Sequence, residues 1–385
     1  MGRRLGLVVV AAAAVVLAIV SAASARPAAT ATATASCAAG VSIGMQAPIT
    51  GPAGSIGSDQ LHWAQFYFTQ WNKTHKVKIK LVQQDTQLDP SKASTTAQAL
   101  ASNGAVMGVI GPAGSDEVQA VAPIFKKAGL AFASGSATRV SLTNGSWKGY
   151  FFRDVPNDGV QGPTDAAYMQ EKLGVTSGSK VMVVDDQESY STGLADIVQN
   201  TLKAKGVNVD RESVSQKSTD FSSLIAKVDS STKVVFLPFQ VASEAQLFAQ
   251  QLQAQGKSAV AFGSDGTFDS SKFTQEGSYI SFFAPDVTTI PADSAIVKAF
   301  HKQFPGATSP FGAPNYVLAQ MYASAVTTAC KDGKISRAEV RKDVFKVSLP
   351  STILGGSLKL TANGDVAGAK FHIFKIVNGK YQTIA

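Results

Sequence analysis

Short apolar runs alternate with longer segments in which apolar residues recur at helical spacing, from Val41 almost to the end of the chain. The short runs predict buried strands, and the longer periodic segments predict helices. Strands that alternate with helices are typical of parallel sheets covered by helices on both faces. The chain therefore predicts an α/β fold of doubly wound sheets.

These elements can be placed by residue range. Asp89 followed by Pro90 is the clearest helix start, because Asp caps the first turn and Pro fits it. Asn378-Gly379 is a strong hairpin turn. The predicted strands are 41–47, 77–83, 180–185, 207–214, 233–239 and 259–263, with extended segments at 151–155, 279–284 and 371–377; the predicted helices are about 58–72, 89–101, 191–205, 221–229, 243–255, 292–304, 316–329 and 336–347.

The stretch from Val106 to Thr138 holds the first candidate site. It predicts a strand, a Gly/Ser loop, a helix opened by Ser115, a second strand and a second Gly/Ser loop that ends at Thr138. The ends of adjacent parallel strands lie side by side, so N–H groups and hydroxyls of both loops can converge on a small anion. We hypothesise that they hold a ligand's carboxylate. Ser115 also has a simpler role as the cap of its helix.

Length favours two lobes. The 385 residues exceed what one hydrophobic core usually organises. The segment from Asn157 to Pro163 predicts an irregular first crossing between lobes, with glycines that permit bending, and Pro285 to Val287 a return crossing. Hydrophobic residues at 45% and charged residues at 16% exclude a chain that is disordered throughout.

The N-terminus has the pattern of a secretory signal. Arg3 and Arg4 precede an apolar run from Leu5 to Val20, and small residues ending at Ala25 follow. We expect residues 1–25 to be a signal peptide and residues 26–39 to be a disordered Ala/Thr leader. The expected location is therefore outside the cytoplasm, in the periplasm or at the cell surface.

Export makes the two cysteines informative. In an oxidising compartment Cys37 can form a disulfide with Cys330, which lies at the end of a late helix. Two unpaired thiols are one alternative. A lipid anchor at Cys37 is another, although this cysteine lies far beyond the apolar run and its preceding residues lack the usual leucine.

Charge and motifs exclude several classes of function. The formal net charge of +8 falls to +6 once Arg3 and Arg4 leave with the signal, and nothing gathers it into a nucleic-acid surface. Residues 40–44 match the G-x-S-x-G elbow of hydrolases, but Ser42 lies at the start of a strand instead of between a strand and a helix. The histidines lack metal-ligand spacing, and no dinucleotide or Walker pattern is present. The sequence therefore predicts no catalytic residue, no metal and no cofactor.

Several short motifs, in this order and spacing, carry a resemblance that covers the chain from about Val41 to its end. They are Ile110-Gly111-Pro112, Val121-Ala122-Pro123-Ile124, Ala128-Gly129, Ser134-Gly135-Ser136-Ala137-Thr138, Gln161-Gly162-Pro163 and Tyr190-Ser191-Thr192-Gly193-Leu194-Ala195. In them the chain resembles the type I periplasmic solute-binding proteins of the branched-chain amino acid (leucine/isoleucine/valine) family of ABC importers.

The resemblance implies an architecture and a function. Two lobes are joined by three crossings and hold the ligand between them. The N-terminal lobe is expected to comprise residues 40–155 and 288–369, and the C-terminal lobe residues 156–287 and 370–385. The expected ligand is a small amino acid, branched-chain type first. The expected partner is a membrane permease that recognises the closed form of a monomer.

The family's ligand positions carry over residue by residue. The resemblance implies that the ligand's carboxylate is bound by the carboxylate grip, which consists of Ser115, Ser136, Ala137 and Thr138. It implies that Asp265 binds the ligand's ammonium and that Tyr190 lines the cleft from the second lobe. Ile56 is expected to contact the ligand side chain. Asp265 could instead brace its turn, and Tyr190 could pack on its own helix.

Two departures from the family widen the choice of ligand. Asp116 and Glu117 follow Ser115, where the family commonly has small hydroxyl residues; their charge suits the helix dipole but opposes an anionic ligand if aimed inward. The family usually has a tyrosine after one strand of the second lobe. This chain lacks it, and Phe239, Gln240 and Val241 occupy that region. An amide, urea or small carboxylate ligand, or a role as the ligand-sensing partner of a membrane receptor, stays open.

Overall fold

The computed structural model describes residues 1–2, 34–306 and 309–385. Two large β-sheets form the centre of its fold. The first sheet has the strand order β3-β2-β4-β5-β6, and every neighbouring pair in it is parallel. Its strands are β2 (Val41–Ala47), β3 (Ile79–Asp85), β4 (Val106–Ile110), β5 (Ala131–Ser134) and β6 (Phe151–Arg153). The sequence placed β2 at these same residues and β3 two residues too early.

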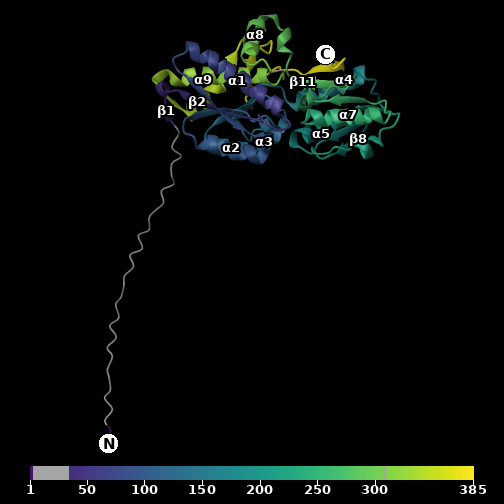
Figure 1. Ribbon diagram of the computed structural model, residues 1–385, viewed down its shortest axis with the longest axis horizontal. Coiled ribbons are helices and arrows are strands. Elements are labelled where there is room, and N and C mark those ends of the chain that lie inside the picture. The colour runs from purple at the N-terminus through teal and green to yellow at the C-terminus, as the bar shows by residue number, and fades with distance from the viewer. Residues whose placement is uncertain (3–33, 307–308) are drawn as a thin grey trace. The chain divides into compact units, whose positions relative to one another are not determined.

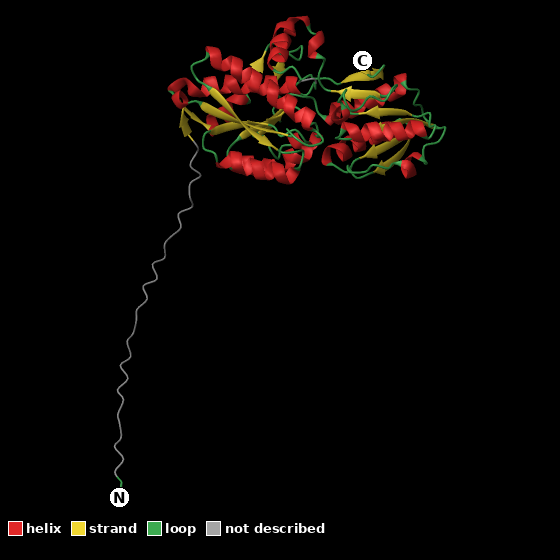
Figure 2. Cartoon of the chain, viewed as in Figure 1, coloured by secondary structure: helices red, strands yellow, loops and turns green. Residues whose placement is uncertain are grey.

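Helices cover both faces of this sheet because its strands are apolar on both sides (Figures 1 and 2). Ala131 and Ala133 of β5 belong to one core cluster and Phe132 to the other, as the alternation of a strand requires. The helices against the first cluster are α1 (Gly54–Thr74), α8 (Ser294–Gln303), α9 (Gly312–Ala329) and α10 (Arg337–Val344); those against the second are α2 (Pro90–Ser102) and α3 (Ser115–Lys127).

The second sheet has the strand order β16-β15-β11-β10-β9-β7-β8. Its strands are β7 (Lys180–Asp185), β8 (Asn208–Ser213), β9 (Thr232–Leu237), β10 (Val260–Gly263), β11 (Tyr279–Phe282), β15 (His372–Val377) and β16 (Lys380–Thr383). Strand β15 is antiparallel to both of its neighbours, β11 and β16, and the other neighbouring pairs are parallel. Val181 and Val183 pack toward α4 (Asp158–Lys172) and α5 (Ser189–Lys203), while Met182 and Val184 pack toward α6 (Ser222–Ile225) and α7 (Ala242–Ala254). The β15–β16 hairpin turns at Asn378-Gly379, as predicted.

The strand order requires three crossings between the sheets. The chain leaves the first sheet after β6, returns to the first lobe after β11, and enters the second sheet again before β15. The two-lobed α/β fold predicted from the sequence is therefore present. The assignment of residue ranges to the two lobes stays a prediction.

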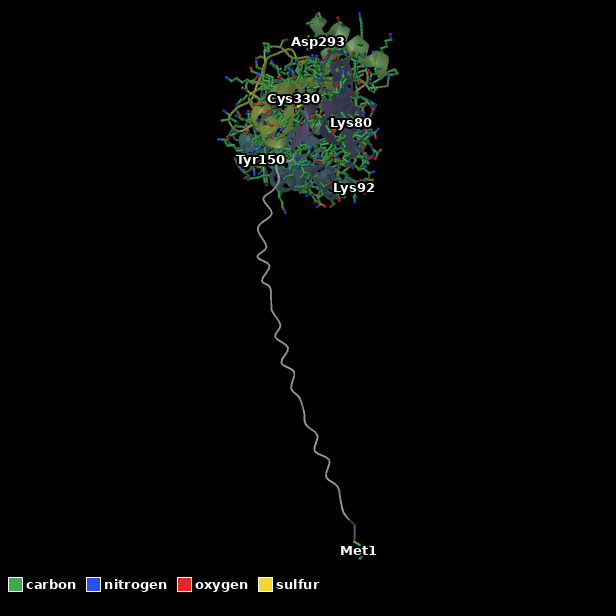
Figure 3. All side chains as sticks on the ribbon, turned by 90° about the vertical axis from the view of Figure 1, so that its left-hand side faces the viewer. Met1, Lys80, Lys92, Tyr150, Asp293 and Cys330 are labelled. Carbon is green, nitrogen blue, oxygen red and sulfur yellow. A yellow bond between two sulfur atoms is a disulfide. The ribbon has the colours of Figure 1, made fainter. Side chains whose placement is uncertain are left out.

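The leader was expected to be disordered, and this is wrong for residues 34–39. Strand β1 (Thr34–Ser36) pairs with β12 (Lys334–Ser336), and a 3₁₀ turn follows at Cys37–Ala39. Cys37 forms the predicted disulfide with Cys330, which is labelled in Figure 3. This bond leaves no thiol at Cys37 for a lipid. The rest of the leader and the signal segment lie outside the described residues, except Met1 and Gly2.

The expected irregular crossing from Asn157 to Pro163 is also wrong. The Asn157 side chain accepts a hydrogen bond from the N–H of Gly159 and caps α4, which begins at Asp158 and includes Pro163. Gly and Pro have low helix propensity, but packing against α5 outweighs it. A Cβ atom on Gly162 would lie 2.5 Å from Cγ2 of Ile197, so this glycine permits the close approach of the two helices.

Smaller differences concern helix lengths and minor strands. Helix α1 begins at Gly54, four residues before the expected start, and α6 is confined to Ser222–Ile225. A short pair, β13 (Ser348–Leu349) and β14 (Leu358–Lys359), was not predicted. Within residues 34–306 and 309–385, none of the helices combines the length and the apolar character that a membrane span needs.

Candidate functional site

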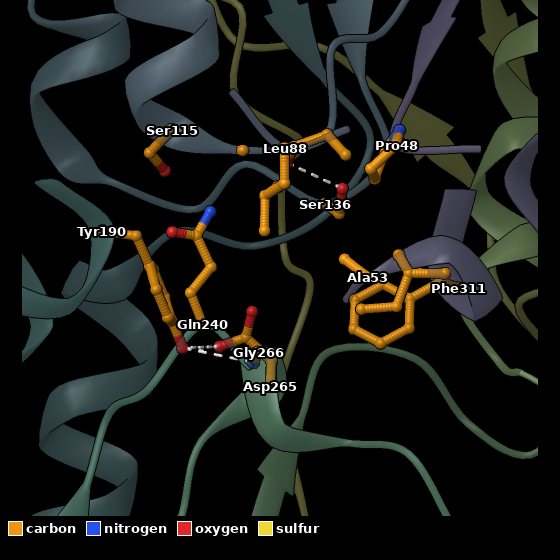
Figure 4. A pocket seen from close by; sticks show the side chains of 13 residues that line it. Pro48, Ala53, Leu88, Ser115, Ser136, Tyr190, Gln240, Asp265, Gly266 and Phe311 are labelled. Carbon is orange, nitrogen blue, oxygen red and sulfur yellow. Dashed lines mark hydrogen bonds between the residues drawn. The ribbon is translucent and has the colours of Figure 1, made fainter. Parts of the chain in front are cut away.

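The predicted ligand residues meet at a cavity of about 40 Å³ (Figure 4). It lies where the loops that follow parallel strands of both sheets face each other, as expected for an α/β fold. The predicted residues that line it are Ile56, Ser115, Ser136, Tyr190 and Asp265. Ala137 and Thr138 are nearly fully buried beside it but do not line it.

Ser115 reaches the cavity in a different role from the expected one. The N-cap of α3 is Gly114, and Ser115 is the first residue of the helix. Its Oγ accepts a hydrogen bond from the backbone N–H of Arg139 at 3.3 Å, so it joins the two Gly/Ser loops. The hydroxyl hydrogen can therefore donate toward a ligand. The prediction that Ser115 caps the helix is wrong, because the preceding glycine takes the extended N-cap conformation.

The second loop is held in place from within its own lobe. Ser136 Oγ donates to the carbonyl of Ala113 and accepts from Nε2 of Gln60, both at 2.9 Å. The buried guanidinium of Arg153 donates to the carbonyls of Ala137 and Arg139, also at 2.9 Å. The loop is therefore preorganised before any ligand arrives.

Two carboxyl groups lie beside the expected carboxylate grip. Glu117 is fully buried, and its Oε2 accepts from the N–H of Gly114 at 2.7 Å. Asp116 is half-buried, with Oδ1 at 3.4 Å from Nε2 of Gln240 on the opposite lobe. Burial raises the pKa of Glu117 to about 7 and also raises that of Asp116. The grip therefore has one N–H donor fewer than the sequence suggested, and Asp116 faces the cleft.

Tyr190 and Asp265 form the opposite wall as a hydrogen-bonded pair. The phenol of Tyr190 donates to Asp265 Oδ1 at 2.6 Å (Figure 4). It also lies 2.7 Å from Ser264 Oγ. Asp265 is 3% exposed, and burial raises its pKa to about 6, while hydrogen bonds from Tyr190 and Gln161 oppose this rise. Tyr190 thus does more than pack on its own helix. A carboxylate held in this way can accept a ligand ammonium.

Asp158 is an acid that the sequence interpretation missed, because its segment was expected to be irregular. It is fully buried, and neither carboxyl oxygen has a well-aligned partner among the described residues. Burial, together with the charge of Asp265, raises its pKa to about 7, and the nearby Thr138 hydroxyl lowers it. Asn157-Asp158 at the start of a helix was the signal that could have located it.

Three further lining residues were missed or left open. Gln240 lines the cavity in the region where the family's tyrosine is absent, and it is 7% exposed. Leu88 and Phe311 complete an apolar side with Ile56. Leu88 has φ of 60°, a conformation that leucine rarely adopts. Neither Leu88 nor Phe311 follows a recognisable local motif.

A second, larger cavity of about 360 Å³ lies elsewhere between the lobes. Aromatic side chains such as Trp63, Phe282, Phe300 and Tyr381 line much of it, and it contains none of the predicted ligand residues. Ligand sites combine apolar walls with a few convergent polar groups. The smaller cavity meets that description, because Ser115, Ser136, Tyr190 and Asp265 converge on it.

Comparison with known proteins agrees with this geometry. The periplasmic binding protein family matches residues 40–380. A leucine-specific-binding protein of Salmonella typhimurium is 25% identical, and the match covers 87% of this chain and 90% of that protein.

Two solved structures extend the comparison of the fold. A leucine-binding protein from Thermotoga maritima superposes with a TM-score of 0.80 at 20% identity, covering 90% of this chain and 98% of the other. A solute-binding protein from R. palustris in complex with benzoate gives a TM-score of 0.77 at 18% identity, covering 90% and 96%. The chain belongs to the type I periplasmic binding proteins, in the leucine/isoleucine/valine-binding family.

Proposed function

We propose that this protein is an extracytoplasmic solute-binding protein of an ABC importer and binds a small amino acid, of branched-chain type, in the 40 Å³ cavity. The observation that carries the proposal is the Tyr190–Asp265 pair opposite Ser115 and Ser136. A zwitterion removed from water needs donors at one end and an acceptor at the other. Each charge-assisted bond contributes about 1.5–3 kcal/mol.

The apolar side of the cavity supports an aliphatic ligand side chain. Ile56, Leu88 and Phe311 line the cavity, and Figure 4 shows Leu88 and Phe311 away from the Tyr190–Asp265 pair. Burying apolar ligand surface there contributes roughly 25 cal/mol per Å². The polar groups would fix the α-carbon end, and the apolar side would select the size of the side chain.

Delivery to a membrane permease is the second part of the proposal. The ligand would bridge both lobes, and its contacts with both would stabilise the closed form that a permease recognises. The Cys37–Cys330 disulfide supports export to an oxidising compartment. We propose a monomer that carries out no catalysis.

A small carboxylate is the second candidate ligand. The R. palustris structure contains benzoate. The pKa of Asp265 is about 6, so its neutral form is accessible and would tolerate a ligand without an ammonium group. The two candidates differ in whether the ligand must carry a cation next to Asp265.

Truncated ligands separate these candidates. Thermal unfolding would be measured with leucine, with 4-methylpentanoate, which is leucine without its ammonium, and with isoamylamine, which is leucine without its carboxylate. Ligand at 100 times its Kd adds about 2.7 kcal/mol of stability, so leucine should raise Tm well beyond either fragment. An equal shift with 4-methylpentanoate would favour the carboxylate ligand. No shift with leucine, isoleucine, valine or any other amino acid would refute the amino-acid proposal.

A further inference from the structure

One charged residue beside the carboxylate grip, Arg139, has no part in the proposed function. It follows Thr138 directly, and its side chain is half-buried. Its backbone is already tied to the grip, because its N–H donates to Ser115 Oγ at 3.3 Å and its carbonyl accepts from the buried guanidinium of Arg153 at 2.9 Å. The base of the Arg139 side chain is therefore fixed next to the grip.

The guanidinium of Arg139 reaches the helix that carries Tyr190. Its Nη1 donates to the carbonyl of Ser189, the first residue of α5, and lies 3.5 Å from Oγ1 of Thr192. Its Nε donates to Ser141 Oγ at 3.0 Å, which holds the side chain from its own lobe. Arg139 follows a strand of the first sheet, whereas α5 packs on the second, so the guanidinium bridges the two lobes.

The surface of α5 has a glycine where the guanidinium packs. A Cβ atom on Gly193 would lie 2.6 Å from Nη1 and 3.2 Å from Cζ of Arg139, closer than non-bonded atoms come. Gly193 lacks the positive φ that would by itself require glycine, and glycine is unfavourable inside a helix. The space that it leaves for Arg139 gives this glycine a physical reason.

The contact does not serve to stabilise the helix. The dipole of a helix disfavours a cation at its N-terminus, so Arg139 is poorly suited to strengthen the first turn of α5. What the contact provides is a hydrogen bond from a charged donor to the Ser189 carbonyl, one of the stronger kinds of hydrogen bond. Because the two partners belong to different lobes, this bond exists only while the lobes are together.

We propose that Arg139 is a positioning residue that couples the carboxylate grip to closure of the cleft, with Gly193 as its docking point on the C-terminal lobe. A ligand carboxylate at Ser115 would hold the loop from which Arg139 extends, and the docked guanidinium would hold α5, and with it Tyr190, against the ligand. Neither Arg139 nor Gly193 lines the cavity, so both act without touching the ligand. This inference rests on the proposed function, in which the cleft closes around an amino acid.

The first test is a double-mutant cycle with leucine. Arg139→Ala removes the bridge, and Gly193→Ala blocks it from the opposite lobe, because the added methyl group displaces the flexible guanidinium. Each variant should bind leucine about tenfold more weakly, as expected for the loss of one hydrogen bond from a charged donor. The double variant should bind no more weakly than either single variant, because both changes remove the same contact.

The loss should lie mainly in faster dissociation, measured by displacing radiolabelled leucine with unlabelled leucine. It should be partial, because Ser55 Oγ still joins the lobes by donating to Asp269 Oδ2 at 2.7 Å. Lys148→Ala removes an exposed positive charge from the same lobe and is the matched control, which should bind leucine like the wild type.

Stability separates positioning from a merely structural role. Alanine is a better helix former than glycine, so Gly193→Ala should keep or slightly raise the Tm of the ligand-free protein while it weakens leucine binding. A lower Tm for Gly193→Ala, with losses of affinity that add in the double variant, would mean that the two residues only support the fold. Unchanged leucine affinity in both folded single variants would also overturn the inference, and would leave the proposed function standing.

A second measurement needs no ligand and separates failure of this inference from failure of the proposed function. Spin labels at Lys92→Cys on α2 and Lys203→Cys on α5, both exposed, would report the distance between the lobes by pulsed electron paramagnetic resonance. Wild-type protein that binds no amino acid would refute the proposed function. The inference would then stand if ligand-free wild type has a short-distance fraction that both Arg139→Ala and Gly193→Ala lower. An absent or unchanged short-distance fraction would overturn it.

Discussion

The two walls of the cleft are built on different principles. The N-terminal wall offers hydroxyls and N–H groups from loops that follow β4 and β5, such as Ser115 and Ser136, and their supporting bonds lie within the same lobe. The C-terminal wall offers the buried carboxyl of Asp265, which follows β10, and a second buried acid, Asp158 of α4, lies behind it. Neutral donors can be arranged by a local loop, whereas a buried charge needs donors from several directions.

This difference assigns different tasks to the two walls. Uncharged donors alone would hold almost any small anion, and Asp116 weakens even that grip by facing the same space. On the proposed function, the charge of Asp265 would distinguish an amino acid from a simple carboxylate. We therefore expect changes in the C-terminal wall to alter which ligand binds, and changes in the N-terminal wall to alter how tightly any ligand binds.

The largest effect is expected from Asp265→Ala. It would leave the ligand ammonium buried without a partner, and truncating one member of a buried charge pair costs about 2–5 kcal/mol. Leucine affinity, measured by calorimetry, should fall by roughly two orders of magnitude or more. The matched ligand control is 4-methylpentanoate, which is leucine without its ammonium, and it should bind the variant no more weakly than the wild type. Equal losses for both ligands would make Asp265 a structural residue.

The N-terminal wall could be predicted from the sequence because its residues lie close together along the chain. Ser115, Ser136 and the loop ending at Thr138 all follow strands in one continuous stretch, so the strand pattern already brings them together. The sequence could not reveal that Glu117 occupies the N–H of Gly114, or that Thr138 turns toward Asp158. Both depend on side-chain orientation.

The C-terminal wall could be predicted only in part. Tyr190 and Asp265 came from the family resemblance, while Asp158 and Gln161 were assigned to an irregular crossing because Gly and Pro disfavour helices. Tertiary packing of α4 on α5 overrides that preference and places both residues behind the site. Gln240 and Phe311 reach the cavity from positions that no local pattern marks.

Removing the disulfide should affect the N-terminal lobe and spare the site. Cys37 and Cys330 are 293 residues apart in the sequence, and neither lines the cavity. Replacing both with serine removes the covalent link that holds β1 and increases the conformational entropy of the unfolded chain. Loss of a native disulfide typically lowers the free energy of unfolding by about 2–5 kcal/mol. Urea unfolding should show this loss, with leucine Kd within about twofold of the wild type. A large loss of affinity would mean that the two ends of the lobe are coupled.

Ser115→Ala tests the neutral wall. The change removes one donor to the ligand carboxylate, worth about 1.5–3 kcal/mol for a bond to a charged group, so leucine affinity should fall roughly tenfold or somewhat more. The affinity of 4-methylpentanoate should fall by a similar factor, unlike its response to Asp265→Ala. Ser94→Ala, on the neighbouring helix α2 and away from the cavity, is a matched control that should bind normally. A loss confined to leucine would contradict the division of tasks between the walls.

The smallest expected effect concerns a contact that joins the two walls. Glu188 precedes α5 in the C-terminal lobe and lies near enough to Asp116 of α3 for the charges of the two carboxyl groups to interact. Burial, with the charges of Asp116 and Asp186, raises the pKa of Glu188 to about 7. Two neighbouring carboxylates repel each other, so we expect closure of the cleft to favour the protonated form of Glu188.

The sign of the pH dependence follows from that preference. Contact with Asp116 is fully stabilising below the ordinary Glu188 pKa of 4.5 and is progressively lost as the pH rises to about 7, where Glu188 ionises in the closed form. Glu188→Gln mimics the protonated acid, so it should bind leucine a few-fold more tightly than the wild type at pH 8 and equally well at pH 4.5. Glu171→Gln, exposed on α4, should match the wild type at both values. If Glu188→Gln showed no gain at pH 8, Asp116 and Glu188 would not meet in the ligand-bound form, and the acids of the two walls would act independently.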